Sequence, residues 1–242
     1  MASPPFHFRK FSIEQGGAAH PVGTDGVLLG AWTDISACRK VLDIGTGTGV
    51  VALMLAQRLS DRPENEAFAI TAVELHGPSA ECARGNFARA PWCDQLILVE
   101  SAIQEFAVPE AGQFDLIVSN PPYFSGQMRA RDPVRRHGRH DETLTHEALL
   151  DCATRLMKPD GRFCGILPPE QGRKLCEAAM RKGLSCNQET EVYARPGKPV
   201  ERLLLRFENI PLPFERNKLV LMDGEGARSA DFQVLVSNFY LK

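Results

Sequence analysis

The tetrapeptide Asn120-Pro121-Pro122-Tyr123 contains the residue types best suited to chemistry in this chain. The Asn120 side-chain oxygen and the Pro121 carbonyl are two hydrogen-bond acceptors, and the prolines restrict φ and stiffen the loop. Tyr123 offers a flat face on which a base could stack. Such a site could hold the two N–H groups of a planar amine or amide and turn its conjugated lone pair toward an electrophile.

A glycine-rich segment lies upstream of this tetrapeptide and follows a short apolar run over residues 41–44. Its glycines would let the backbone approach a ligand closely, and they depart from the G-x-G-x-x-G spacing of pyrophosphate-binding loops. Together with the tetrapeptide, the segment predicts S-adenosylmethionine-dependent N-methyl transfer. No metal is needed, because the sulfonium of that cofactor is already a strong electrophile. The cofactor-binding residues expected at the end of the run and in this segment are Asp43, Gly45, Thr46, Gly47 and Gly49.

Glu74 ends a second strand-like run, over residues 68–73, and its carboxylate could accept hydrogen bonds from both hydroxyls of a ribose. Ligands of open α/β sheets bind beyond the carboxyl ends of the strands. The glycine segment could instead be only a tight strand-to-helix turn. Glu74 and Asn120, each placed at the end of another strand-like run, favour a ligand site over that reading.

Strand-like apolar runs alternate with helix-like segments along the chain, which predicts an α/β fold with a mostly parallel sheet covered by helices on both faces. Thr24 is expected to be the N-cap of a helix, and Trp32 and Trp92 are expected to pack in the interior. We expect strands at 41–44, 68–73, 96–99, 114–119, 163–167, 184–194 and 201–207, a turn at 158–161, and helices at 49–59, 78–89, 149–156, 170–182 and within 229–242, the last packing Leu235, Phe239 and Leu241.

The length of 242 residues predicts a single domain over 1–242, with 1–20 as an N-terminal extension and 124–143 as a basic substrate loop. The net charge of −2 gives no global sign of nucleic-acid binding, so any such case rests on a local patch. Seven cysteines form no CxxC pair, which favours reduced thiols and a cytoplasmic location. Neither a signal peptide nor an apolar run long enough for a membrane helix is recognisable.

Arginines gather in residues 128–140, directly after the tetrapeptide, where they could lie against RNA phosphates while an unpaired base enters the site. A solvated loop is the alternative interpretation of this segment. The arginines expected to contact RNA are Arg129, Arg131, Arg135, Arg136 and Arg139, and a weaker extension of the surface includes His7, Arg9, Lys10, Arg195, Lys198 and Arg202.

Segments 21–32, 41–49, 72–75, 119–123 and 238–241 resemble those of the bacterial tRNA adenine-N6 methyltransferases, and the resemblance covers nearly the whole chain. It implies a class I methyltransferase (Rossmann-like) fold, with a seven-stranded sheet whose last strand is antiparallel. It also implies S-adenosylmethionine as cofactor and, as substrate, adenine 37 in the anticodon loop of a valine tRNA. Further cofactor-binding residues implied by the resemblance are Thr24, Asp25, Leu75, Asn120 and Ala102, the last standing where the family usually has an aspartate.

In this interpretation the catalytic residues are Asn120, Pro121 and Tyr123: the first two accept the hydrogens of adenine N6, and Tyr123 stacks the base. A neutral amide cannot act as a general base, so the proton is expected to leave to solvent. Three alternatives are methylation of a release-factor glutamine, methylation of guanine N2 in ribosomal RNA, and a catalytically silent module that binds cofactor and RNA. Glutamine methyltransferases normally carry a helical region ahead of the catalytic domain, and only about 20 residues precede Val22.

Overall fold

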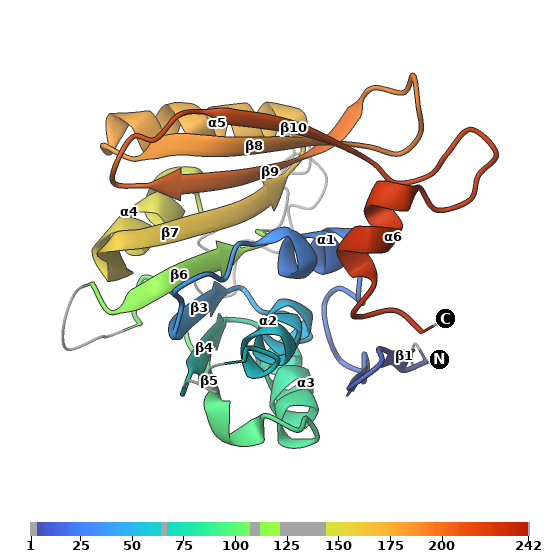
Figure 1. Ribbon diagram of the computed structural model, residues 1–242. Helices are drawn as coiled ribbons and strands as arrows, with labels where there is room; N and C mark the ends of the chain where they lie inside the picture. The colour runs from blue at the N-terminus through green and yellow to red at the C-terminus, as the bar shows by residue number, and fades with distance from the viewer. Residues whose placement is uncertain (1–3, 64–66, 107–111, 122–143, 242) are drawn as a thin grey trace, which may run out of the picture.

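The computed structural model describes residues 4–63, 67–106, 112–121 and 144–241 (Figure 1). Within these residues, eight strands form one mixed sheet in the order β10-β8-β9-β7-β6-β3-β4-β5. The strands are β3 (Lys40–Ile44), β4 (Ala69–Glu74), β5 (Leu96–Glu100), β6 (Phe114–Ser119), β7 (Met157–Leu167), β8 (Ser185–Tyr193), β9 (Val200–Glu208) and β10 (Glu215–Val220).

The strand directions confirm the predicted class of fold. Strands β5, β4, β3, β6 and β7 pair in parallel, while β9 lies antiparallel between β7 and β8. The sheet has one strand more than the seven expected, because β10 pairs in parallel with the outer side of β8. Most of β10 is exposed and polar, so its sequence lacks the apolar alternation that marks a half-buried strand.

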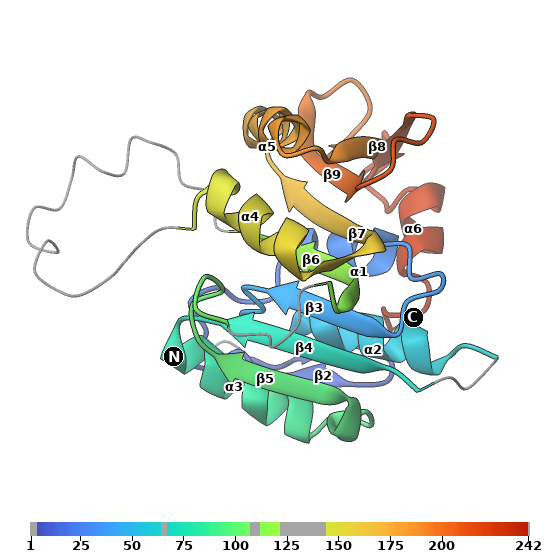
Figure 2. The same ribbon diagram turned by 90° about the vertical axis from the view of Figure 1, so that its left-hand side faces the viewer.

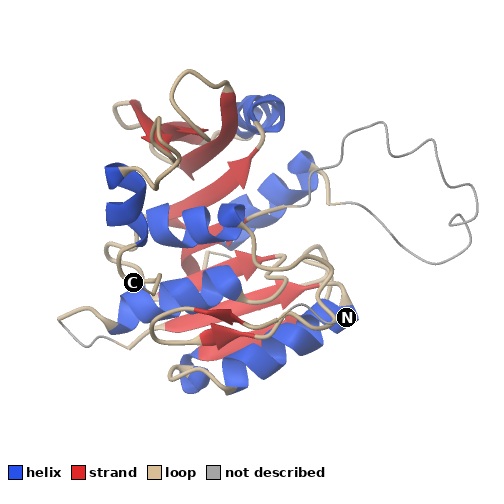
Figure 3. Ribbon diagram, turned by 90° about the vertical axis from the view of Figure 1, so that its right-hand side faces the viewer, coloured by secondary structure: helices blue, strands red, loops and turns tan. Residues whose placement is uncertain are grey.

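Helices cover both faces of the sheet, which Figures 2 and 3 show from opposite sides. One core cluster joins α1, α2, α3 and α6 to their face, and a second joins α4 and α5 to the other. The helices are α1 (Thr24–Trp32), α2 (Val50–Ser60), α3 (Gly77–Ala88), α4 (His146–Leu156), α5 (Pro169–Arg181) and α6 (Ala230–Val236), with a short 3₁₀ helix, η1 (Cys93–Gln95), before β5.

The two ends of the described chain pack on the α2 side of the sheet. A small antiparallel hairpin of β1 (Phe6–His7) and β2 (Ser12–Ile13) lies there, and the Arg9 N–H donates to the Phe239 carbonyl at 2.9 Å. Phe239 is buried, as predicted for the C-terminal helix region, but Leu241 is 59% exposed, so its predicted packing is wrong. Leu241 lies beyond the end of α6, where no element covers it within the described residues.

The turn predicted at 158–161 is wrong as well, since these residues belong to the start of β7. The register between β6 and β7 shifts between Phe114 and Leu116, which pair with Met157 and Arg162. The intervening residues of β7 therefore bulge out of the ladder. The Asn209 side-chain amide donates to the Lys158 and Pro159 carbonyls and satisfies the backbone of this bulge.

Candidate methyl-transfer site

The glycine loop joins the carboxyl end of β3 to the start of α2. Gly45, Gly47 and Gly49 adopt φ values of 72°, 59° and 85°, the left-handed region that side chains disfavour. A Cβ added at Gly45 or Gly47 would meet no atom within 4 Å, whereas one at Gly49 would lie 2.5 Å from Cε1 of Phe87 on α3. The first two glycines therefore border open space suited to a ligand, and the third permits close packing of α2 on α3.

Asp43 and Thr46 stabilise this loop from beneath. The Thr46 hydroxyl donates to Asp43 Oδ2 at 2.6 Å, and the two residues are 5% and 1% exposed. Burial raises the pKa of Asp43 to about 7, although the hydrogen bond from Thr46 opposes that rise. Asp43 thus positions the loop, and direct cofactor contacts by Asp43 and Thr46 stay predictions.

Glu74 stands beside the loop at the end of β4, the neighbour of β3 in the sheet. Its two carboxylate oxygens accept the backbone N–H groups of Gly47, at 2.9 Å, and His76, at 2.8 Å. These two bonds fix the orientation of the carboxylate, and each oxygen retains capacity to accept a ribose hydroxyl. The adjacent Leu75 is 55% exposed and offers an apolar surface for a flat ring.

Ala102 follows the end of β5, the next strand outward. The Ser101 N–H donates to the Glu74 carbonyl at 3.0 Å, which places this segment beside the end of β4. The Ala102 carbonyl accepts the Ser101 hydroxyl and the Glu105 N–H, both at 3.0 Å. The Ala102 methyl group offers no acceptor, so any contact here is apolar or uses the backbone.

Asn120 follows β6 on the other side of β3. Ile44 and Ser119 are partners in the parallel register, and the buried Ser119 hydroxyl donates to the Ile44 carbonyl at 2.9 Å. The next residues on the two strands are Asn120 and Gly45, so the half-buried Asn120 follows β6 next to the start of the glycine loop. Pro121 is buried. The sheet therefore brings the predicted amine-binding acceptors and the predicted cofactor loop to one edge.

Helix α1 brings Thr24 and Asp25 toward the same edge. Its N-cap is Gly23, with no side-chain capping bond, so the predicted capping role of Thr24 is wrong and Thr24 is the first helical residue. A Cβ added at Gly26 would lie 2.9 Å from Cγ1 of Val50, the first residue of α2. This close approach fixes the first turn of α1 against the end of the glycine loop.

Arg202 makes a contact at this edge that sequence reasoning missed. Its Nε donates to Asp25 Oδ2 at 2.8 Å, across 177 positions of sequence. The sequence suggested only a weak RNA contact for it, because nothing in a β-strand pattern links an arginine to the start of a distant helix. Two other members of that weaker surface have protein partners: Arg9 donates to the Tyr240 carbonyl, and Lys10 pairs with Asp61.

Six predicted site residues lie outside the described residues, and their roles stay predictions. They are Tyr123, Arg129, Arg131, Arg135, Arg136 and Arg139.

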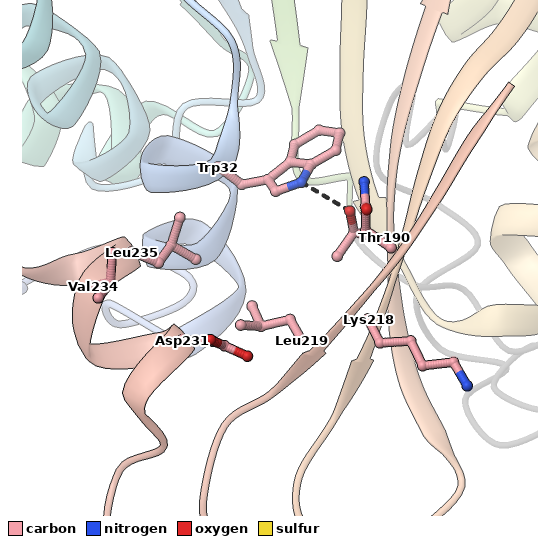
Figure 4. Close-up of a pocket in the computed structure, with 8 residues that line it drawn as sticks. Trp32, Thr190, Lys218, Leu219, Asp231, Val234 and Leu235 are labelled. Carbon is pink, nitrogen blue, oxygen red and sulfur yellow. Dashed lines mark hydrogen bonds between the residues drawn. The ribbon is translucent and has the colours of Figure 1, made fainter. Parts of the chain in front are cut away.

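A shallow hollow of about 370 Å³ lies elsewhere, between α1, α6, β8 and β10 (Figure 4). The Trp32 indole N–H donates to Thr190 Oγ1 at 3.0 Å in its wall. Trp32 ends α1 and is therefore at the opposite end of that helix from Asp25. Trp32 and the buried Trp92 both pack against the core, as expected.

Comparison with solved structures identifies the class of the fold. The structure of a predicted O-methyltransferase from Agrobacterium tumefaciens superposes with a TM-score of 0.67 at 20% identity, covering 89% of this chain and 96% of that one. A Thermus thermophilus 16S rRNA N2 G1207 methyltransferase, solved with AdoMet and guanosine, gives a TM-score of 0.58 at 20% identity, covering 87% of this chain and 50% of that one. The fold is that of a class I methyltransferase.

Comparison with sequences identifies the family. The model of the methyltransferase small domain matches residues 26–182. A relative from Yersinia enterocolitica is 41% identical over 98% of this chain and 92% of its own length, and one from Yersinia pestis is 40% identical over 98% and 93%. Both are named tRNA1(Val) (adenine(37)-N6)-methyltransferase. The chain belongs to this family of methyltransferases.

Proposed function

We propose that this chain transfers the methyl group of S-adenosylmethionine to the exocyclic N6 of adenine 37 in a valine tRNA. The observation that carries the proposal is the register of β3 and β6. Because Ile44 pairs with Ser119, the residue Asn120 follows β6 next to the start of the open glycine loop, which supports its assignment to the substrate nitrogen. The names of the relatives supply the substrate, and the site supplies a chemical reason for it.

The residues of the edge fit the cofactor. Open space beside Gly45 and Gly47 leaves room for the part of the cofactor that would lie against the backbone of the glycine loop. The oriented carboxylate of Glu74 can accept the ribose hydroxyls. Leu75 offers apolar surface for the adenine ring. When bound, the cofactor supplies an electrophilic methyl group on sulfonium.

Two acceptors on the other side of β3, one from a side chain and one from the backbone, would bind the substrate nitrogen. The Asn120 oxygen and the Pro121 carbonyl would accept the two N6 hydrogens, and this orients the nitrogen lone pair toward the methyl carbon. The same two acceptors stabilise the positive charge that develops on nitrogen during transfer. The N6 proton leaves to solvent, because Asn120 has no lone pair basic enough to hold it. Tyr123 would stack the base, and the arginines of residues 128–140 would contact phosphates.

None of the helices in the described parts of the chain is long and apolar enough to cross a membrane. A cytoplasmic location, where tRNA is available, completes the proposal.

The decisive test is transfer of labelled methyl from S-adenosylmethionine to unmodified valine tRNA, followed by nucleoside analysis. N6-methyladenosine at position 37 is the expected product. Release factor and ribosomal RNA serve as competing acceptors in parallel reactions. Label in either of them, with none in tRNA, would support the methyltransferase chemistry but reject tRNA as the substrate.

A further inference from the structure

Two cysteines lie side by side where α5 packs on β8 (Figure 2). The chain leaves α5, turns at Gly183, where φ is 80°, and continues into β8, and the Leu184 N–H donates to the Ala179 carbonyl at 3.0 Å. Cys176 lies three residues before Ala179 and shares its helix face. Cys186 lies two residues after Leu184 and shares its strand face. The fold therefore brings both thiols to the same level of the packing between helix and strand.

The two thiols interact directly. Both are half-buried against the core cluster that joins α4 and α5 to the sheet, and each side chain has the other as a partner. The backbone around Cys186 is fixed by a bulge at Asn187, whose buried side chain donates to the Ile210 carbonyl at 2.9 Å. Cys186 Sγ also lies 3.7 Å from the Gln188 carbonyl. Cys186 is thus held on its strand within reach of Cys176.

The distribution of protons in the pair favours reaction at Cys176. A hydrogen bond from the Cys186 thiol lowers the pKa of Cys176, although burial opposes the shift. The carboxylates of Glu177 on α5 and Glu189 on β8 oppose it as well. The pKa of Cys186 is raised by the same hydrogen bond and by burial. By contrast, burial raises the pKa of Cys164, in the centre of the sheet, to about 12. Because the thiolate is the nucleophile, Cys176 is the cysteine of the pair that reacts first.

We propose that Cys176 and Cys186 form a reversible disulfide when the protein meets hydrogen peroxide. The Cys176 thiolate attacks one peroxide oxygen, the oxygen–oxygen bond breaks, and the leaving hydroxide takes up a proton, so that Cys176 becomes a sulfenic acid. The Cys186 sulfur then attacks the Cys176 sulfur, and the hydroxyl group leaves with the Cys186 proton as water.

The electrons of this reaction balance. The two thiols lose two electrons, and one hydrogen peroxide gains them and becomes two waters. The dithiol is the resting form, in agreement with the reduced thiols expected from the sequence, and thiol–disulfide exchange with a thiol reductant restores it. The modification uses none of the residues assigned to methyl transfer, so it is tested without reference to the proposed function.

The test oxidises the folded wild-type chain with hydrogen peroxide, blocks the remaining thiols by alkylation and maps tryptic peptides by mass spectrometry. Trypsin cleaves at Arg181 and Lys182, so a bridge between Cys176 and Cys186 would join two separate peptides. We expect this cross-link within a single chain, and a thiol reductant should remove it. Because the bridge closes a loop of the unfolded chain, the oxidised protein should melt about 5 °C above the reduced protein. Cys176→Ser should abolish the cross-link and the shift, whereas Cys93→Ser, which removes an exposed cysteine, is the matched control and should change neither.

A second measurement tests the interaction of the thiols in the reduced protein. Alkylation of Cys176 by iodoacetamide should require a higher pH in Cys186→Ala than in the wild type, because the hydrogen bond that favours the thiolate is lost. An identical pH dependence in the two proteins would contradict the thiol pair.

Three results of the oxidation would overturn the inference. Oxidation of Cys176 to sulfinic acid with Cys186 left as a thiol would show that the two sulfurs do not reach bonding distance. Cross-links through Cys93 or between chains, in place of the expected one, would show that exposure alone selects the reacting cysteine. If peroxide left both thiols unmodified, Cys176 and Cys186 would be packing residues only.

Discussion

The two edges of the central sheet use aspartates in opposite ways. At the carboxyl edge, buried Asp43 accepts from the Thr46 hydroxyl beneath a loop whose glycines border open space. At the amino edge, Asp115 accepts from the Lys40 N–H at 2.7 Å and from the Lys158 ammonium. The amino-edge groups therefore satisfy one another, whereas the carboxyl-edge groups shape a surface on which a ligand can rest.

A second amino-edge cluster follows the same rule. Asp34, in the segment after α1, pairs with Arg162, whose side chain is only 13% exposed. The Arg162 guanidinium also donates to the Ser36 carbonyl at 2.8 Å, so the charge is enclosed by protein groups. The comparison shows that charged residues alone do not mark a functional site, because they can be paired with other groups of the protein.

The largest effect should come from Asn120→Ala, which removes one of the two acceptors for the substrate nitrogen. We expect the methyl-transfer rate to fall by about 100-fold or more, as for loss of one preorganised polar group at a reacting centre, with little change in S-adenosylhomocysteine affinity. Single-turnover transfer to tRNA and calorimetry measure the two quantities. Asn209→Ala at the amino edge is the matched control and should lower stability without changing the rate, since Asn209 binds the β7 bulge. Wild-type turnover by Asn120→Ala would reject its assigned role.

A smaller effect, on the free energy of unfolding, should distinguish Gly49 from Gly183. Gly49→Ala would place a Cβ 2.5 Å from Phe87 at a φ of 85°, so we expect it to lower the free energy of unfolding by about 3 kcal/mol. Gly183→Ala, at a φ of 80° with no atom within 4 Å of the added Cβ, controls for backbone strain alone and should cost about 1 kcal/mol. Chemical denaturation measures both values. Equal losses would show that packing of α2 on α3 does not depend on this glycine.

A further effect should be a pH dependence of opposite sign at the two edges. Burial raises the pKa of Asp43 to about 7, so its contribution to stability is present below the unfolded value of 3.8 and is lost as pH rises toward 7. Burial alone would raise the pKa of Asp115, but bonds from Lys158, Lys40 and Arg39 outweigh it and hold that pKa below 3.8. Its contribution is present above the unfolded pKa and is lost as pH falls through the lowered folded pKa.

Unfolding experiments between pH 3 and pH 8 therefore test each edge separately. Asp43→Asn should flatten the decline in stability that the wild type shows as pH rises between about 4 and 7. Asp115→Asn should be less stable than the wild type at neutral pH, and the difference should shrink as the solution becomes more acidic than about pH 4. The same pH trend for both variants would contradict the contrast between the edges.

Local patterns predicted most of the regular elements. The mainly apolar runs before Gly45, Glu74 and Asn120 form β3, β4 and β6, because parallel strands buried on both faces require nearly continuous apolar residues. Gly183, at a φ of 80°, follows the end of α5 as expected for a helix stop. The failures include β10, whose residues are exposed and polar, and the start of β7, where turn-forming residues bulge within a strand.

The sequence by itself determined which residues could do chemistry: the glycines at 45–49, the carboxylate of Glu74 and the amide of Asn120. Their types and their places after apolar runs are local properties, and they predicted one edge of a sheet. Tertiary structure decided which charged side chains meet. Asp25 meets Arg202 because the fold brings the start of α1 to the start of β9, and Asp34 meets Arg162 because the same helix ends near β7. Pairings across 177 and 128 residues depend on strand order, which no local pattern specifies.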